Sequence, residues 1–181
     1  MECVDKESWF GYGMDELLLA DQTAVITGGA SGNGRAIAEM FAREGADIVI
    51  GDIQAEPRDG GEPTHTRIAS EYDVAVEFVE CDVTSVSDIE EMLEVAERLG
   101  GVDCMVNNAG IFSRHSFLDV SEDDFDEMVA VNVKGVFFGA QVAAEQMLES
   151  GGGSIINLSS AAGMRGSATF VPYCTTKGAV R

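Results

Sequence analysis

Basic residues are scarce in this sequence, and lysine is rarer than arginine. The 181 residues include 32 acidic and 11 basic side chains, for a formal net charge of −21 at pH 7, and the lysines are Lys6, Lys134 and Lys177. An excess of negative charge of this size repels nucleic acid and anionic membranes, so neither is expected as a partner. Hydrophobic residues make up 45% of the chain, which excludes disorder as the reason for the charge.

Two explanations of the acidity stay open. It provides ordinary solubility, or it adapts the protein to high salt, where screening removes the repulsion between carboxylates while they keep the surface hydrated. The size of the excess favours the second explanation. We therefore predict a halophilic protein whose stability rises with the concentration of KCl.

A long apolar run and a signal-peptide pattern are also missing. No stretch approaches the ~20 apolar residues needed to span a membrane. Asp5, Glu7, Asp15 and Glu16 stand where a signal peptide would begin with basic residues. We therefore expect a cytoplasmic protein.

Cysteines and histidines are too few and too scattered to predict a metal site or a disulfide framework. The four cysteines show no Cys-x-x-Cys spacing. Cys81 and Cys104 fall in or beside expected strands and are interpreted as buried free thiols. Cys174 is interpreted as a packing residue rather than a reactive thiol. His65 and His115 lie far apart in polar segments, so no metal or catalytic role is predicted for either.

Strand-like and helix-like segments alternate along the chain, which predicts right-handed βαβ units and a parallel sheet covered on both faces. The expected fold is α/β, a doubly wound, Rossmann-like sheet in three layers. Residues 1–21 are expected to be a lead-in and residues 22–181 one domain. Strands are expected over residues 23–27, 46–52, 75–81, 103–107 and 154–158. Helices are expected over 35–43, up to about residue 72, after a cap at Ser87, and from 122 to about 149.

A glycine-rich turn lies between the first expected strand and the first expected helix. Its glycines follow the spacing Gly-x-x-x-Gly-x-Gly at Gly28, Gly32 and Gly34. Glycines let the backbone approach a pyrophosphate closely, and the helix N-terminus attracts the anion. The position between strand and helix favours dinucleotide binding over an ordinary tight turn.

Asp52 ends the second expected strand. A carboxylate at this position accepts hydrogen bonds from ribose hydroxyls and repels a 2′-phosphate, so it favours NAD over NADP. Arg35 and Arg58 are close enough in sequence that use of both cofactors is not excluded. The alternative interpretation is a solvated aspartate at the end of a strand.

Tyr173 and Lys177 stand four residues apart, just after Pro172, a residue favoured in the first turn of a helix. Because residues i and i+4 share one helical face, the phenol and the ammonium are expected side by side. An ammonium beside a phenol favours the phenolate, which suits a general acid/base. Ser160 follows the last expected strand, where open α/β sheets place their ligands. Taken alone, the pair is explained equally well by a surface helix.

These features together resemble the short-chain dehydrogenase/reductase family from about Leu19 to Arg181. The matching motifs occur in the family's order and at its spacings. They are residues 27–34 (TGGASGNG), Asp82-Val83, residues 107–110 (NNAG), Asn132, Ser160 and Tyr173-x-x-x-Lys177.

The resemblance implies a role for each matching residue. Tyr173 would exchange a proton with the substrate oxygen, assisted by Lys177, while Ser160 would orient that oxygen and Asn132 would fix a water in a proton relay. Asn132 is also unusual in itself, since it interrupts an apolar run. The implied cofactor site consists of Gly28, Ser31, Gly32, Asn33, Gly34, Asp52, Ile53, Asp82, Val83, Asn108, Tyr173 and Lys177.

The expected function is hydride transfer between NAD(H) and an alcohol or carbonyl substrate, with NAD favoured over NADP as the cofactor. A homo-oligomer, dimer or tetramer, is implied by the resemblance.

Two departures from the family are visible. Asn33 stands where an apolar residue is usual, and family members continue beyond the helix of Tyr173, so the fold is expected to be incomplete at its C-terminal side. The alternative functions are an NAD-binding module without turnover and an inactive fragment.

Overall fold

The computed structural model describes residues 17–181. Most of the lead-in predicted for residues 1–21 lies outside these residues, and its boundary with the domain stays a prediction. Leu19 is attached to the rest of the fold, because its N–H donates to Glu44 O at 2.9 Å and its side chain packs against the core.

The described strands form one parallel sheet, with the strands in the order β3-β2-β1-β4-β5. The strands are β1 (Thr23–Thr27), β2 (Asp47–Asp52), β3 (Val76–Glu80), β4 (Cys104–Asn107) and β5 (Ser154–Asn157). The order reverses beside β1, since the chain first adds strands on one side and then continues on the other. This confirms the predicted doubly wound α/β class.

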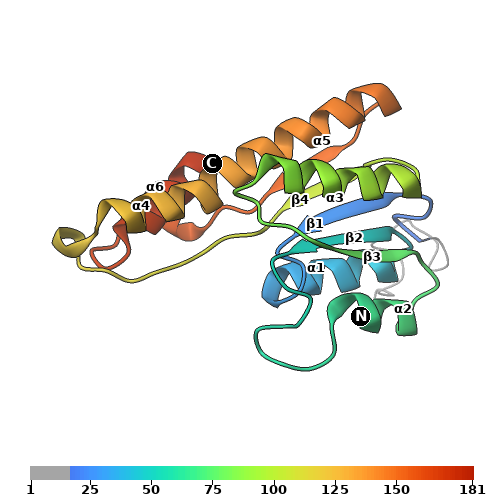
Figure 1. Cartoon of the computed structure of the whole chain (residues 1–181), viewed down its shortest axis with the longest axis horizontal. Coiled ribbons are helices and arrows are strands. Elements are labelled where there is room, and N and C mark those ends of the chain that lie inside the picture. Colours follow the sequence, from blue (N-terminus) through green and yellow to red (C-terminus); the bar gives the residue numbers. More distant parts are fainter. Residues whose placement is uncertain (1–16) are drawn as a thin grey trace, which may run out of the picture.

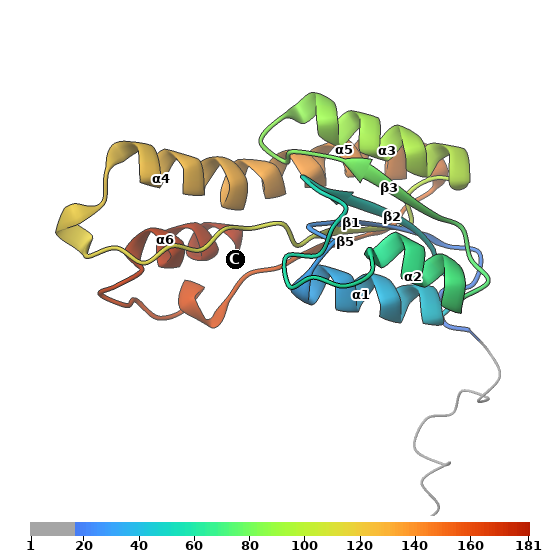
Figure 2. The ribbon, with the colours of Figure 1, turned by 60° about the horizontal axis from the view of Figure 1, so that its bottom comes forward.

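Helices cover both faces of the sheet and complete three layers. Figures 1 and 2 show α1 and α2 on one face, with α3 and α5 on the other. The helical segments are α1 (Gly32–Arg43), α2 (Thr64–Glu71), α3 (Val86–Leu99), α4 (Glu122–Val129), the π-helical η3 (Ala130–Gly135), α5 (Val136–Ser150) and α6 (Val171–Val180). Short 3₁₀ turns are η2 (Phe117–Asp119) and η4 (Ala161–Gly163).

The core lies on the two faces of β1 and β2, because successive residues of a strand point to opposite sides. Ile26 and Ile48 pack with the alanines of α1 on one face. Val25 and Val49 pack with Met92 of α3 on the other. Burying one such side chain stabilises the fold by about 1.5–3 kcal/mol. The glycine-rich turn is therefore attached to the most buried strand.

Three local predictions need correction. Ser85, not Ser87, caps α3, and its hydroxyl accepts from Asp88 N–H. The first helix begins at Gly32 rather than Arg35, so it starts inside the glycine-rich turn. The long helix predicted from residue 122 is divided into α4, η3 and α5. The π-helical segment could not be predicted, since its i→i+5 bonding has no periodicity of its own in the sequence.

One part of the fold extends beyond the carboxyl ends of the strands. There α6 packs against α4, η3 and η4, and Figures 1 and 2 both show α4 and α6 side by side away from the sheet. Within residues 17–181, no helix is both long and apolar enough to cross a membrane.

Candidate active site

A cavity of about 640 Å³ opens at the carboxyl ends of the strands, where the strand order reverses between β1 and β4. Loops on either side of such a point diverge and leave a crevice, which is where open α/β sheets bind ligands. Its lining comes from the segments that follow β1, β2, β3 and β4, and from the α4–η3 helix. The predicted residues among them are Gly28, Ser31, Gly32, Asn33, Asp52, Ile53, Asp82, Val83 and Asn108.

The glycines of the turn have different structural roles. Gly28 has φ +66°, and a β-carbon there would come within 2.9 Å of Ala109 Cα, so the turn packs directly on the end of β4. Gly34 is buried, and a β-carbon there would collide with Gly28 O. Gly32 has φ +55° and no atom near its missing side chain, so this position faces the open cavity. A ligand therefore reaches the backbone closely at Gly32.

Asp52 holds the turn in place. Its Oδ2 accepts from Ala30 N–H at 3.0 Å and its Oδ1 accepts from Ile53 N–H at 2.9 Å. A carboxylate offers about four acceptor sites, so capacity remains for a ligand hydroxyl. The side chain is half-buried at the cavity wall. Asp52 thus has a structural role besides the cofactor contact predicted for it.

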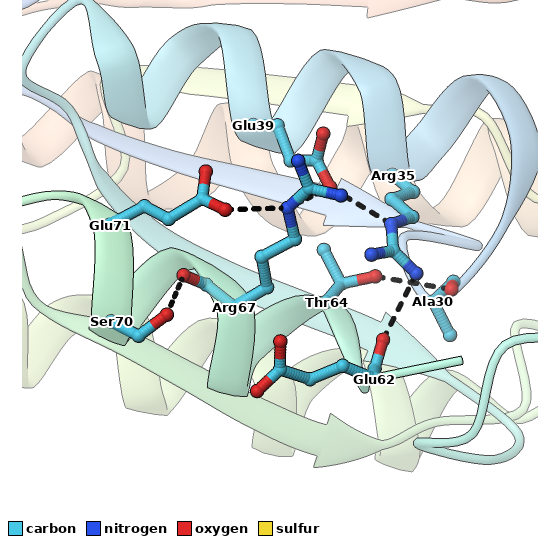
Figure 3. Close-up of polar contacts among 8 residues, drawn as sticks. All are labelled: Ala30, Arg35, Glu39, Glu62, Thr64, Arg67, Ser70 and Glu71. Atoms are coloured by element: carbon cyan, nitrogen blue, oxygen red, sulfur yellow. Dashed lines mark hydrogen bonds and ion pairs between the residues drawn. The ribbon is translucent and has the colours of Figure 1, made fainter.

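The loop between β2 and α2 is fastened to the glycine-rich turn. Arg58 N–H donates to Ser31 Oγ at 2.8 Å, and Thr64 Oγ1 donates to Ala30 O at 3.1 Å. Arg35 is occupied, because its guanidinium pairs with Glu39 at 2.8 Å and donates to a backbone carbonyl of the loop at 3.0 Å (Figure 3). Of the two arginines considered for a 2′-phosphate, only Arg58 lines the cavity.

Asn108 joins the ends of β1 and β4. Its Nδ2 donates to Thr27 O at 2.8 Å and to Gly28 O at 3.1 Å, while its own N–H donates to Thr27 Oγ1 at 3.0 Å. The side chain therefore fixes the turn. Asp82 accepts from Thr84 N–H at 2.9 Å and closes a local turn.

Asn132 lies in the π-helical segment and is fully buried. Its Oδ1 accepts from Ile111 N–H at 2.8 Å, and its Nδ2 donates to Ile111 O at 2.9 Å and to Thr176 Oγ1 at 3.2 Å. π-helical turns within α-helices occur frequently at functional sites. Asn132 thus connects the loop after β4, the long helix and α6.

Lys177 is buried, with 5% of its surface exposed, and its Nζ donates to Leu158 O at 2.8 Å. Burial lowers the pKa of its ammonium, because desolvation penalises the charged form. A β-carbon at Gly110 would stand 3.1 Å from Asn132 Oδ1 and 3.5 Å from Lys177 Nζ. The amide and the ammonium therefore flank the same backbone position.

Tyr173 lies on α6 beside Lys177, whose Nζ is 5.9 Å from the centre of the phenol ring. Its hydroxyl makes no hydrogen bond to any residue in the range 17–181. Ser160 caps η4, and its Oγ accepts from Ala162 N–H at 3.1 Å, which leaves its O–H able to donate. The structure brings Asn132 and Lys177 together at Gly110, and Lys177 beside the ring of Tyr173. For Ser160 it gives the position at the end of the segment after β5.

Several residues of the site were not predicted from sequence. Thr27 Oγ1 accepts from the N–H groups of Asn108 and Ala109, and Thr176 bonds Asn132. The signal for Thr27 was a hydroxyl at a strand end; Thr176 had none, because its partner lies 44 residues away. Among the described residues, no cluster of three or more His, Cys, Asp or Glu side chains could hold a metal ion.

A parallel sheet with a glycine-rich turn and a cavity at its switch point defines a nucleotide-binding class of α/β protein. The sequence model of one family, described as short chain dehydrogenase, matches residues 22–181. The chain therefore belongs to the short-chain dehydrogenase/reductase family, as its motifs predicted.

Several relatives cover most of this chain. An uncharacterized oxidoreductase of Mycobacterium bovis is 42% identical over 161 residues, which are 88% of this chain and 63% of the relative. Sorbitol dehydrogenase of Cereibacter sphaeroides is 39% identical, over 90% of this chain and 61% of its own length. L-2,3-butanediol dehydrogenase of Corynebacterium glutamicum is 40% identical, over 88% of this chain and 62% of its own length. The chain thus spans less than two thirds of the length of these relatives.

Solved structures show the same fold. A short-chain dehydrogenase/reductase from Mycobacterium marinum superposes with a TM-score of 0.83 at 34% identity, over 92% of this chain and 65% of its own. A protein described as a putative short-chain alcohol dehydrogenase, from Sinorhizobium meliloti, superposes with a TM-score of 0.82 at 33% identity, over 90% of this chain and 63% of its own. The sheet described here is therefore part of a larger fold in these neighbours, in agreement with the incompleteness predicted for the C-terminal side.

Proposed function

We propose that this chain is the cofactor-binding and proton-transferring part of an NAD-dependent oxidoreductase that acts on CH–OH groups. The observation that carries the proposal is the buried cluster of Asn132, Thr176 and Lys177 beside Tyr173, which is linked to the cavity through the hydrogen bonds of Asn132 to Ile111, a residue of the cavity lining. Relatives named as sorbitol and L-2,3-butanediol dehydrogenases support the reaction class.

The cavity suits NAD. The open space at Gly32, at the N-terminus of the twelve-residue helix α1, accommodates a pyrophosphate, which the helix dipole attracts. The remaining acceptor capacity of Asp52 suits ribose hydroxyls and disfavours a 2′-phosphate. Arg58, exposed at the same wall, is the residue that would permit NADP. When bound, NAD supplies the hydride acceptor for alcohol oxidation.

Protein groups would manage the proton. Tyr173 takes the hydroxyl proton of the alcohol as the bond between that oxygen and the carbinol carbon becomes a carbonyl. Ser160 donates its O–H to the same oxygen and orients it. The ammonium of Lys177 stabilises the phenolate of Tyr173, and burial, which lowers the pKa of this ammonium, eases release of a proton toward solvent. Asn132 keeps the loop at Ile111 and helix α6 in register.

An NAD-binding module without turnover is the second candidate. It is favoured by the exposure of β5, which leaves this side of the sheet less enclosed than the cavity. Tyr173 and Lys177 together favour turnover, because pure binding has no need for a proton donor.

The test is to titrate the purified chain with NADH and follow fluorescence, and then to assay a panel of secondary alcohols and ketones. The proposal expects NADH to bind more tightly than NADPH, and turnover to fall at least roughly a hundredfold in Tyr173→Phe, the scale of general acid/base catalysis. Tyr72→Phe, which alters a tyrosine at the end of α2, is the matched control. Binding without turnover would support the module, tighter binding of NADPH would contradict the role of Asp52, and absence of both would contradict the proposed function.

A further inference from the structure

Acidic residues are absent from the two segments that surround Tyr173. All 32 acidic residues lie at or before Glu149, so residues 150–181 contain none, and residues 104–118 also contain none. The basic residues of these segments are Arg114, Arg165, Lys177 and Arg181. In a chain with a net charge of −21, these segments carry only positive formal charge.

The fold brings the two acid-free segments together. His115 N–H, in the loop after β4, donates to Thr169 O, in the loop before α6, at 3.0 Å. The rings of Phe112 and Phe170 lie 5.6 Å apart in an edge-to-face arrangement. Figures 1 and 2 both show the loop after β4 passing along α6. The result is one continuous region, beside the proposed proton donor, whose own residues carry no carboxylate, although α4, which carries Asp124, packs against α6.

Phe112 forms an apolar wall next to Tyr173. The two rings lie 5.0 Å apart at an interplanar angle of 89°, a favourable edge-to-face contact. Phe112 remains 50% exposed, so much of its surface is available to a ligand. The position of Phe112 in the fold is fixed by Asn132, which binds the preceding residue, Ile111, through two hydrogen bonds.

Arg114 lies over this wall. Its guanidinium carbon is 5.8 Å from the centre of the Phe112 ring, the geometry of a cation–π contact. Arg35 and Arg67 form ion pairs with glutamates. Arg114 forms no ion pair within residues 17–181 and its side chain is exposed, so its donors can bind an incoming group. A guanidinium binds a carboxylate through two parallel hydrogen bonds.

We propose that the substrate is a ketone or secondary alcohol that carries an apolar segment and a carboxylate. Phe112 contacts the apolar segment and Arg114 binds the carboxylate, while the reacting oxygen lies at Tyr173. The net negative charge of the chain repels such an anion, and the two acid-free segments, with Arg114, offer it the local positive charge that it needs to bind. The inference rests on the oxidoreductase function proposed above and adds its substrate class.

The test uses two ketones that differ in charge, 4-acetylbenzoate and methyl 4-acetylbenzoate, with NADH as the reductant. In reduction, NADH gives a hydride to the carbonyl carbon and Tyr173 gives a proton to its oxygen, so the product is the alcohol. We expect the wild-type chain to prefer the acid over the ester by about tenfold or more in kcat/KM, the scale of one charge-assisted contact. Arg114→Gln should remove most of this preference, and Arg114→Lys should restore part of it. Arg43→Gln, an exposed arginine at the end of α1, is the matched control and should keep the preference.

A second readout does not depend on turnover. Binding of 4-acetylbenzoate to the chain, followed by ligand NMR, should weaken about tenfold in Arg114→Gln and should weaken with added KCl, which screens the attraction. Turnover or binding with no preference for the acid would overturn the substrate class and leave the oxidoreductase function intact. Absence of NADH binding and of turnover on both probes would instead contradict the proposed function. If the acid binds as tightly to Arg114→Gln as to the wild type, Arg114 is not its partner.

Discussion

The central strand of the sheet, β1, and the edge strand β5 differ in how they are held. All five residues of β1 are buried, and the strand has a neighbour on each side, β2 and β4. All four residues of β5 are exposed, with Ile155 at 37% and Ile156 at 42%, and its single neighbour is β4. A groove of about 430 Å³ beside β5, between α5 and the end of α6, is lined mainly by apolar side chains, including Phe137 and Val180.

The half of the fold built on β1, β2 and α1 (the cofactor half) is therefore stabilised by burial, and the half built on β5 and α6, which contains Tyr173, by particular polar contacts. Asn132 bonds Ile111 and Thr176, and Lys177 bonds Leu158 O. Ser159 Oγ adds a hydrogen bond to Lys177 O at 2.7 Å. A buried polar contact positions groups accurately but adds only about 1 kcal/mol net. Accurate positioning near Tyr173 is thus combined with modest stabilisation.

Thiol reactivity should show the largest difference between the halves. Cys81 is buried in the sheet core, and burial, with smaller contributions from Asp88 and other carboxylates, raises the pKa of its thiol to about 12. At pH 8 only roughly one molecule in ten thousand has the Cys81 thiolate, and this fraction rises tenfold per pH unit up to the pKa. In a Cys3→Ser background, we expect iodoacetamide to label Cys174, half-buried on α6, at least about a thousandfold faster than Cys81. Peptide mass spectrometry over time measures both rates. Similar rates would mean that the core opens readily.

Truncating one isoleucine in each half compares the two strands directly. Ile26→Ala removes a fully buried side chain from β1 and should lower the free energy of unfolding by about 2–5 kcal/mol. Ile156→Ala removes a 42% exposed side chain from β5 and should cost less than about 1 kcal/mol. Urea denaturation followed by circular dichroism measures both values. Equal losses would show that β5 is more buried in solution than in the structure.

Replacing the buried side-chain amide of Asn132 tests the hydrogen bonds that connect it to Ile111 and Thr176. Asn132→Leu keeps the volume but leaves the backbone groups of Ile111 unpaired, so it should cost about 1–3 kcal/mol. The amide of Ile111 should also exchange with deuterium faster than in the wild type. Gln141→Leu, at an exposed position of α5, is the control and should change little. An unchanged stability in Asn132→Leu would mean that water replaces the amide without loss.

Added salt should stabilise the two halves unequally, and its effect on the free energy of unfolding should be the smallest of those predicted. Because most of the acidic residues precede residue 104 and residues 150–181 contain none, screening relieves repulsion mainly in the cofactor half. We expect KCl to raise the stability by about 1 kcal/mol, or roughly 2–4 °C in Tm. Calorimetry measures the shift, and hydrogen exchange should show the gain in α3 rather than in α6. A melting temperature independent of KCl would contradict the halophilic interpretation of the charge.

The cofactor half could be predicted closely because its signals are local. The residue range predicted for the first strand, 23–27, is that of β1, and the glycine-rich turn follows it directly, since apolar runs and glycine spacing are read within a few residues. The hydrogen bonds of Asn132 could not be predicted in this way, because in the sequence Asn132 stands out only as a polar residue in an apolar run. Its partners come from the loop after β4 and from α6, and no short-range pattern links them.

Local sequence patterns predicted the strands, most of the helices, the family, and the residue types at the expected site positions. These follow from periodicity, glycine placement and motif spacing, which are properties of neighbouring residues. The tertiary structure decided which of those side chains are already engaged. Asp52 supports the glycine-rich turn, Lys177 is buried with a lowered pKa, and β5 is left exposed. Burial and hydrogen bonding depend on segments distant in the chain, so only the assembled fold could settle them.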